Sequence, residues 1–327
     1  GLELAAVWVR LLPLAEIAEH IGENLDFLSG ERGRADRHRS LRAVFEHSWH
    51  LLGPGEQDVL CKLSVFRGGF RLEAAREVTG ASLPVLTALV DKSLLRRSPE
   101  GRYSLHVLLG QYAREKLAEY PGEEAEVRER HGHHFLSLLA SLGETIPGPD
   151  GLAALRTLDE ELENIRAAWQ WAVAGRRAGE LGRAALPGVR YFNSRTRYRE
   201  GFALYGEAAT ALQGGEWADA HPLALGQVLT VQAWFAMRLG RHDEAARLAE
   251  RGLARVPADH RAALHNHNTL GFIAMQTGHY PEAERHYQRV LAWTEERGDE
   301  PQQAGILLNL AWVKTVMGHL DEAGRYA

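Results

Sequence analysis

Cysteine is almost absent from this chain of 327 residues, which contains only Cys61. A single thiol excludes an internal disulfide framework and fits a protein of a reducing compartment. Cys61 lies within an apolar run, where a buried structural thiol is far more common than a nucleophile. We therefore expect Cys61 to be buried and chemically inert.

Long apolar runs are also absent. No run approaches the roughly 20 residues that a membrane-spanning helix needs, and no signal peptide opens the sequence. Apolar residues still make up 45% of the chain, and Ala and Leu dominate while β-branched residues are sparse, which favours helices. From these features we expect a mainly α-helical, cytoplasmic protein that does not contact a membrane.

Motifs for catalysis are missing as well. The sequence contains no G-x-x-x-x-G-K-[ST] phosphate loop and no apolar strand that ends in paired acids for Mg²⁺. No Ser-His-Asp or Cys-His arrangement has local support, and acidic runs such as residues 159–161 are typical of helix surfaces. We therefore predict no catalytic residues and no enzyme activity for this chain.

Histidines cluster at two places and raise the question of a metal site. His131, His133 and His134 lie close together, as do His265 and His267. Residues i and i+2 of a helix point to different sides, so His131 and His133 cannot bind one ion together. His131 and His134 could do so, but no cysteine or paired carboxylate completes a zinc set. We expect no bound metal.

One phrase recurs three times near the C-terminus, as GRHDEAAR at 240–247, GHYPEAER at 278–285 and GHLDEAGR at 318–325. Such a period indicates an array of helical hairpins. In each unit the Gly is expected to end a first helix and the Glu-Ala pair to open a second. A degenerate copy lies at 196–212. Small residues mark the expected helix crossings: Ala233, Gly271 and Ala311 before each Gly, and Ala245, Ala283 and Ala323 after it.

These units resemble the tetratricopeptide repeat in its longer variant, whose concave surface is the default binding site. Alignment on the three glycines places Trp234, Phe272 and Trp312 at one position of the first helix, which usually faces the concave groove. The same rings could instead fill the core between helices. If they face the groove, its wall would hold Thr230, Trp234, Arg238, His265, Asn268, Phe272, Gln276, Leu308, Trp312 and Thr315.

Residues 40–118 predict a compact unit of a different kind. Ser40 is a plausible N-cap for SLRAVFEHSWHLL, a second helix is expected over DVLCKLSVF, and LEAAREVTG and SLPVLTALVDKSLL follow. The segment LLRRSPEGRYSLH then alternates as a strand, a turn at 98–101 and a second strand. Helices followed by a β-hairpin are typical of a winged helix.

The string from LRAVFEHSWHLLGPGEQDVLCKLSVFRGGFRLEAA through LVDKSLLRR to YSLHVLLGQYAREKL resembles the winged-helix segment of STAND-class signal-transduction ATPases. It is most similar to bacterial regulators, of the NB-ARC, MalT and AfsR kind, that join an ATPase core to tetratricopeptide repeats. ELENIRAAWQWAV at 161–173 resembles the helix that opens their superhelix, and LELAAVWVRLL resembles the end of their ATPase lid.

The resemblance implies four segments. These are the end of the lid and a linker at 1–39, a winged helix at 40–118, a helical connector at 119–185, and tetratricopeptide-like repeats at 186–327. The fold class is therefore mainly α, a winged-helix domain followed by a right-handed α-solenoid. Because an array normally ends in a polar capping helix, we expect the repeats to continue beyond Ala327.

The resemblance also suggests a nucleotide contact. In NB-ARC relatives, a Met-His-Asp motif places its His near the β-phosphate of ADP. The matching triplet here is Leu105-His106-Val107, so the His is kept and the acid is not. An imidazole N–H could donate to a phosphate oxygen. The alternative is a His that packs at a strand-to-helix junction with one ring nitrogen on a backbone carbonyl.

Two functions remain. The first is a non-catalytic regulatory and sensor module of a STAND-type ATPase in transcriptional regulation or defence signalling. Its winged helix would control the nucleotide state, and its repeats would bind a protein, a peptide or a small-molecule inducer. The resemblance implies ATP or ADP in the full-length protein, contacts with its own ATPase core, and oligomerisation on activation.

The second function is a stand-alone repeat scaffold whose winged helix binds DNA. The candidate recognition helix at 82–95 is mainly apolar and offers only Lys92, while Arg96, Arg97 and Arg102 decorate the hairpin. Phosphate contacts and base readout need more polar side chains than these. We therefore do not expect DNA binding through this chain.

Overall fold

The structure is a computed structural model that describes residue 42, residues 45–214 and residues 216–327. Its contacts form two compact units, which we describe separately. Unit 1 contains the described residues up to Phe135 together with Asp159–Ala168, and unit 2 contains Leu136–Leu158 and Trp169–Ala327. The predicted lid segment and linker at 1–39 and the predicted N-cap Ser40 lie outside the described residues.

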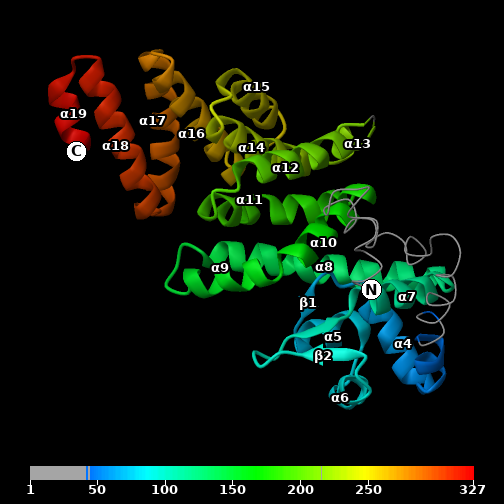
Figure 1. Cartoon of the computed structure of the whole chain (residues 1–327). Coiled ribbons are helices and arrows are strands. Elements are labelled where there is room, and N and C mark those ends of the chain that lie inside the picture. Colours follow the sequence, from blue (N-terminus) through cyan, green and yellow to red (C-terminus); the bar gives the residue numbers. More distant parts are fainter. Residues whose placement is uncertain (1–41, 43–44, 215) are drawn as a thin grey trace, which may run out of the picture. The chain divides into compact units, whose positions relative to one another are not determined.

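In the described part of unit 1, helices precede a hairpin and a further helix follows it, in the order that the sequence predicts for a winged helix (Figure 1). Residues 45–50 are also helical. The elements are α4 (Pro54–Leu63), β1 (Gly69–Phe70), α5 (Leu72–Thr79), α6 (Leu83–Asp91), β2 (Leu95–Arg97), β3 (Tyr103–Leu105) and α7 (Val107–Ala118).

Helix α4 begins earlier than the sequence suggests. Gly53 is its N-cap, and the backbone N–H of Gly53 donates to the Glu56 carboxylate over 2.8 Å. Pro54 occupies the first helical position, where its missing N–H would have no partner within the helix. The predicted extension of this helix to Phe66 was wrong, because α4 ends at Leu63.

The sheet of unit 1 has three strands in the order β1-β3-β2. The predicted hairpin is confirmed: β2 and β3 pair antiparallel, and Gly101 occupies the turn with a φ of 82°. The sequence did not predict β1, which pairs Phe70 with Tyr103 of β3. Two residues are too few to show an alternating pattern.

The core of unit 1 lies between its helices and this sheet. Leu63, Phe70 and Leu86 are completely buried, and the ring of Phe66 stacks on Phe70 at a centroid distance of 4.4 Å. Cys61 is also buried, as predicted, and burial raises the pKa of its thiol to about 12. Such a thiol is not a nucleophile at neutral pH.

Residues 159–168 also belong to unit 1, and the buried side-chain amide of Asn164 links them to its sheet. They lie at the junction of α9 (Gly151–Glu160) and α10 (Leu162–Ala174), which follow α8 (Pro121–Thr145). Nδ2 of Asn164 donates to the carbonyl oxygen of Gly69 over 3.0 Å, and Oδ1 accepts from the backbone N–H of Arg67 over 2.7 Å. Asn164 therefore fastens this junction to the chain just before and within β1.

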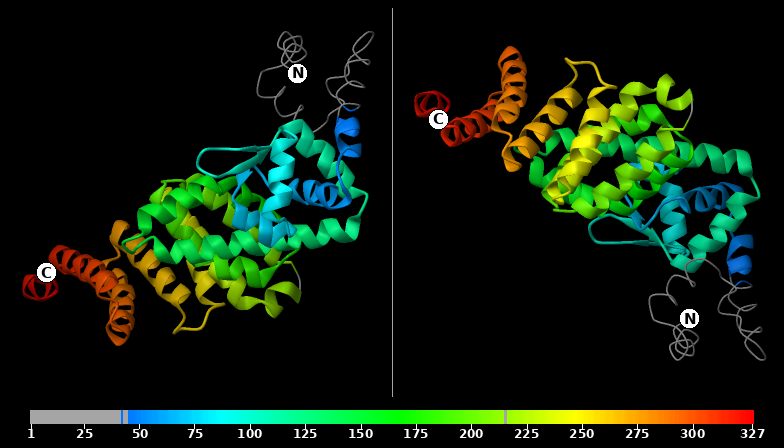
Figure 2. Two further views of the ribbon diagram at one scale, coloured as in Figure 1. Left: turned by 90° about the horizontal axis from the view of Figure 1, so that it is seen from below. Right: turned by 90° about the horizontal axis from the view of Figure 1, so that it is seen from above.

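Unit 2 is an array of antiparallel helices that follow one another in chain order (Figure 2). It confirms the predicted mainly α, solenoid-like arrangement of tetratricopeptide type. Its helices are α11 (Ala178–Ser194), α12 (Tyr198–Leu212), α13 (Glu216–Ala220), α14 (Pro222–Arg238), α15 (His242–Leu253), α16 (Arg261–Gln276), α17 (Tyr280–Arg297), α18 (Glu300–Val316) and α19 (Leu320–Tyr326).

The three repeated glycines end their helices as predicted. Gly240, Gly278 and Gly318 have φ values of 76°, 81° and 82°, in the left-handed region that Gly adopts without a steric penalty. In each turn the N–H after the Gly donates to the carbonyl five residues earlier, for example Arg241 to Ala236 over 2.9 Å. This is the Schellman pattern of helix termination.

The degenerate unit uses the same turn without a glycine. Thr196 has a φ of 53°, and the N–H of Arg197 donates to the carbonyl of Phe192 over 2.8 Å. Gly201 then takes the position of the repeated Ala, and an added Cβ there would lie 2.6 Å from the Phe235 ring. The alignment of 196–212 with the later repeats is therefore confirmed.

Small residues lie where the helices of a hairpin cross. Ala233, Ala245 and Ala283 are completely buried. At Gly271 an added Cβ would lie 2.9 Å from the Tyr287 ring. The close approach of paired helices that the sequence predicts at these positions is therefore present.

Candidate functional site

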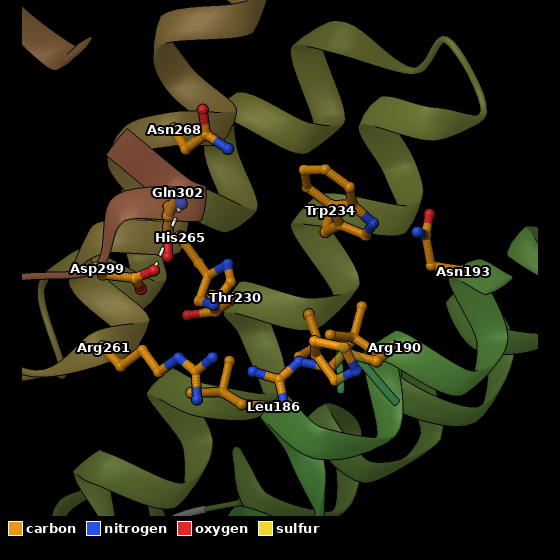
Figure 3. A pocket seen from close by; sticks show the side chains of 13 residues that line it. Leu186, Arg190, Asn193, Thr230, Trp234, Arg261, His265, Asn268, Asp299 and Gln302 are labelled. Atoms are coloured by element: carbon orange, nitrogen blue, oxygen red, sulfur yellow. Dashed lines mark hydrogen bonds between the residues drawn. The ribbon is translucent and has the colours of Figure 1, made fainter. Parts of the chain in front are cut away.

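A cavity of about 430 Å³ opens in unit 2 between α11, α14, α16 and α18. This volume lies in the range of small-molecule sites. Figure 3 shows side chains from these helices that converge on it. Its lining residues are Pro147, Leu186, Val189, Arg190, Asn193, Thr230, Val231, Trp234, Arg261, His265, Asn268, Asp299 and Gln302.

Four of the residues that the sequence places in the groove line this cavity: Thr230, Trp234, His265 and Asn268. Trp234 comes from α14, and His265 and Asn268 come from α16. Their helices are neighbouring first helices of successive repeats, which brings the same face of each helix to the cavity. Contact of these residues with a ligand stays a prediction.

The other predicted groove residues do not line the cavity. Arg238 lies at the end of α14, where its guanidinium donates to the Tyr198 hydroxyl over 2.7 Å and stacks on the same ring. Trp312 on α18 is 47% exposed. The remaining members are the half-buried Phe272 and the exposed Gln276, Leu308 and Thr315.

The aromatic residues at the repeated position differ in burial from the aromatic residues of the core. Trp234 and Phe272 are half-buried and Trp312 is exposed, whereas the neighbouring Phe235 and Tyr287 are completely buried. The core between the helices is therefore filled by aromatic residues other than those at the repeated position. This arrangement favours the groove interpretation of the repeated aromatic residues over the core interpretation.

Thr230 contributes to the cavity wall without offering its hydroxyl. Its Oγ1 donates to the carbonyl of Gly226 over 2.7 Å and accepts from Nδ2 of Asn266 over 2.8 Å. The residue is 1% exposed. Its place at the site is therefore structural, because it ties α14 to α16.

Two arginines at one edge of the cavity share a single carboxylate. Arg190 of α11 and Arg261 of α16 both donate to Glu144, which lies in the last turn of α8. Nη1 of Arg261 lies 3.3 Å from each carboxylate oxygen, and Nη1 of Arg190 also donates to the carbonyl of Gly143 over 3.1 Å. Figure 3 shows the two guanidinium groups pointing toward one another.

Burial and the charges of Arg190 and Arg261 shift the pKa values of the two titratable groups beside them, Glu144 and His265. Burial opposes ionisation of Glu144, but the hydrogen bond and charge of Arg190 and the charge of Arg261 outweigh it and lower the pKa of the carboxyl. Burial, aided by the same arginines, lowers the pKa of His265 to about 4. His265 is therefore neutral at pH 7 and offers one ring N–H and one acceptor nitrogen.

Two polar atoms at the cavity are enclosed and have no hydrogen-bond partner among the described residues. They are Nε1 of Trp234, a donor, and Oδ1 of Asn193, an acceptor. A buried polar group without a partner costs about 1–3 kcal/mol. Such atoms are expected where a ligand or water completes the site.

Sequence reasoning missed four polar or charged residues of the cavity lining: Arg190, Arg261, Asp299 and Gln302. Arg190 precedes the clear repeats, and Arg261 lies one turn before the aligned groove positions of α16. Asp299 and Gln302 belong to the first turn of the last repeat, where the Asp299 carboxylate accepts from the Gln302 N–H over 3.4 Å. A periodic pattern identifies the face of a helix, but not which helix ends meet around a cavity.

His106 is the N-cap of α7, directly after β3. Its Nδ1 accepts from the backbone N–H of Leu108 over 3.3 Å, and the side chain is exposed. This bond places the ring hydrogen on Nε2. The ring contacts the backbone at this strand-to-helix junction, but through the Leu108 N–H rather than the expected carbonyl, and it is exposed rather than packed. The nucleotide contact stays a prediction.

The clustered histidines have structural partners. Nε2 of His131 lies 3.4 Å from Oδ1 of Asn164, and Nδ1 of His134 lies 2.6 Å from the Glu77 carboxylate. Among the described residues, no group of three or more His, Cys, Asp or Glu could hold a metal ion. None of the described helices is both long enough and apolar enough to cross a bilayer.

Two of the basic residues that the sequence singles out in unit 1, Lys92 and Arg102, pair with acids. Nζ of Lys92 lies 2.6 Å from the Glu56 carboxylate. Arg102 contacts the carboxylates of Glu160 and Glu161 and donates to the carbonyl of Gly69 over 2.9 Å. These partners reduce the positive charge that the hairpin and its helix can offer to a phosphate backbone.

Comparison with known proteins finds relatives named as regulators. A Mycobacterium bovis protein named as an HTH-type transcriptional regulator, Mb0914c, is 36% identical over 183 residues, which are 53% of this chain and 20% of that protein. The regulatory protein AfsR of Streptomyces griseus is 28% identical over 336 residues, which cover 92% of this chain and 34% of AfsR. No family model matches the chain.

A solved structure covers 99% of this chain and 57% of its own: the STAND protein PH0952 of Pyrococcus horikoshii, which has a tetratricopeptide repeat sensor. The sequence identity is 16% and the TM-score is 0.35. The chain spans about a fifth of the length of the mycobacterial regulator and about a third of AfsR.

Proposed function

We propose that this chain is the regulatory and sensor part of a STAND-type signalling ATPase. Residues 45–118 form a winged helix that controls the nucleotide state, and the repeats bind an inducer or a protein partner. The observation that carries the proposal is the similarity to a regulatory protein over 92% of the chain. The proposed output is transcriptional regulation or defence signalling.

The cavity of unit 2 supports the sensor role. It combines apolar walls with a few convergent polar groups, which is the usual composition of a small-molecule site. The groups that reach it bind and orient rather than react: a neutral imidazole, carboxamides, an indole, the carboxylate of Asp299 and two paired guanidiniums. The chemistry of these groups is that of recognition, and we propose that the chain itself catalyses no reaction.

Control of the ATPase follows from differential binding. A ligand shifts a closed–open equilibrium only to the extent that it binds one state more tightly. A shift from 1:99 to 99:1 needs roughly a 10⁴-fold difference in affinity. In our proposal the repeats stabilise the closed state, and occupation of the cavity favours the open one.

His106 provides the proposed nucleotide contact. Its Nδ1 is engaged by the Leu108 N–H, so its Nε2–H is the ring donor that remains. In the full-length protein this N–H would donate to a phosphate oxygen of bound ADP. The residue is exposed in the described chain, as the contact requires.

The test begins with the gene upstream of Gly1, where a G-x-x-x-x-G-K-[ST] phosphate loop is expected in the same reading frame. The extended protein should retain ADP, and His106→Ala should weaken ADP binding about tenfold. His47→Ala, an exposed histidine of the same unit, is the matched control. A gene without a phosphate loop would overturn the proposal, and unchanged ADP affinity in His106→Ala would remove His106 from it.

A second candidate is a repeat scaffold whose winged helix binds DNA. The HTH-type name of the mycobacterial relative favours it. The ion pairs of Lys92 and Arg102 weigh against it. Titration of a DNA duplex at low salt distinguishes the two, because tight binding that weakens steeply with added salt is expected only of the scaffold.

A further inference from the structure

The cavity of unit 2 has more hydrogen-bond donors than acceptors along one edge. Each guanidinium carries five N–H donors, and the partners of Arg190 and Arg261 are a single carboxylate and one carbonyl. Elsewhere on the cavity wall, the enclosed Nε1 of Trp234 is a further donor without a partner among the described residues. A donor-rich wall binds groups that carry several acceptor oxygens.

The two arginines are already arranged around a carboxylate. Arg190 and Arg261 approach Glu144 from two helices, 46 and 117 residues away in sequence. The carboxylate of Glu144 is half exposed, while the side chain of Arg190 is only 20% exposed. Glu144 itself does not line the cavity, whereas both arginines do. The acid therefore reaches this guanidinium pair from outside the cavity.

The opposite part of the wall is apolar and aromatic. The indole of Trp234 stands across the cavity from the guanidinium groups (Figure 3). Leu186, Val189 and Val231 are the apolar aliphatic residues of the lining, and Leu186 lies beside the guanidinium groups (Figure 3). Planar rings pack well on an indole face and gain from burial of their apolar surface.

We propose that the cavity binds a small organic acid with a planar ring, whose carboxylate competes with that of Glu144 for the donors of Arg190 and Arg261 and whose ring packs on Trp234. This inference rests on the proposed sensor function, since it names the chemical class of the inducer. Glu144 acts as an internal stand-in for the carboxylate and competes with it.

The probes are three aromatic acids, benzoate, salicylate and indole-3-acetate, each paired with its primary amide, and inorganic phosphate. Binding to the chain of 327 residues is measured by ligand-observed NMR and isothermal titration calorimetry. At least one acid should bind, and its amide should bind at least about tenfold more weakly, because the bidentate, charge-assisted hydrogen bonds are lost. Phosphate alone should bind more weakly than that acid, since it has no ring.

Variants locate the site. Arg190→Gln and Arg261→Gln should each weaken binding of the acid about tenfold, and Glu144→Gln should strengthen it by a similar factor because the competitor is removed. Trp234→Phe keeps a ring and removes the N–H. Arg247→Gln changes an exposed arginine outside the cavity and should leave binding unchanged. Circular dichroism shows that each variant is folded.

Two results would overturn the inference. One is that none of the three acids binds wild type or Glu144→Gln more tightly than its amide. The other is that the acid binds equally well to Arg190→Gln and Arg261→Gln. Neither result affects the phosphate loop and the ADP measurements that test the proposed function, so the two failures are distinguishable.

Discussion

The side-chain amide of Asn266 donates a 2.8 Å hydrogen bond from Nδ2 to Oγ1 of Thr230, 36 residues earlier. Both residues are almost completely buried. Gly252 on α15 leaves room for the pair, since an added Cβ would lie 2.8 Å from Nδ2 of Asn266. A polar contact thus joins the first helices of two successive repeats directly behind the wall of the cavity.

Removal of the acceptor should destabilise the array. Thr230→Val keeps the shape of the side chain and leaves Nδ2 of Asn266 buried without a partner, at an expected cost of about 1–3 kcal/mol in the free energy of unfolding. When Asn266 is already replaced by Leu, the Thr230→Val substitution should lower the free energy of unfolding less than it does in wild type. The expected difference between the two losses is about 0.5–3 kcal/mol. Urea unfolding of wild type, both single variants and the double variant measures this coupling. Additive effects would contradict the contact.

Two glycines of α8 should respond oppositely to the same substitution. At Gly143 an added Cβ would lie 2.4 Å from the carbonyl oxygen of Pro187 on α11, so Gly143→Ala should cost about 1–3 kcal/mol. At Gly122 nothing lies within 4 Å of the added Cβ, so Gly122→Ala should be neutral or slightly stabilising. Thermal unfolding compares the two variants. Equal midpoints would contradict the close approach of α8 and α11.

Thr196 offers a site for stabilisation. Its φ of 53° is unfavourable for a β-branched residue, and Gly occupies the same turn in the three later repeats. Thr196→Gly should therefore raise the free energy of unfolding by up to about 1 kcal/mol. Thr210→Gly, at an exposed position inside α12, should lower it by a similar amount and serves as the control. A loss of stability in Thr196→Gly would contradict the strain.

The stability of unit 1 should fall as the pH is lowered from 6.5 toward 4. Burial, with a smaller contribution from nearby positive groups, lowers the pKa of His131 to about 4. The unfolded chain, with a His pKa near 6.5, then takes up a proton that the folded chain does not. This loss is at most about 1.4 kcal/mol per pH unit across this window, and it is absent above pH 6.5.

Denaturant unfolding from pH 7 to pH 4.5 measures this loss. His131→Gln should show a smaller loss than wild type, while the control His133→Gln should keep the full loss because its side chain is 45% exposed. Other buried histidines, such as His265, contribute equally to all three proteins. Parallel curves for wild type and His131→Gln would contradict the assignment.

Local signals in the sequence predicted most of the fold. The repeated Gly and Ala positions predicted the ends and crossings of the helices, because a left-handed turn and a close helix contact each admit few residue types. The hairpin around Gly101 was predicted for the same reason. Contacts between distant segments, such as Asn164 with Gly69, have no local signature and were missed.

The residues of the candidate site fall into the same two groups: those with a signal in the local sequence and those without one. Trp234, His265 and Asn268 follow from the repeat register, because identical positions of stacked helices share one face. Arg190 and Arg261 depend on how three helices meet around Glu144, which no periodic pattern contains. Sequence reasoning therefore found the aromatic part of the cavity and missed its charged part.

The position of Glu144 also has a consequence for folding kinetics. Its contact with Arg261 closes a loop of 117 residues, so it can form only after the intervening helices are in place. We expect Glu144→Gln to change the unfolding rate measured by stopped flow and to leave the refolding rate nearly unchanged. The carboxylate that holds the place of a ligand would then also govern how long the assembled array persists before it opens.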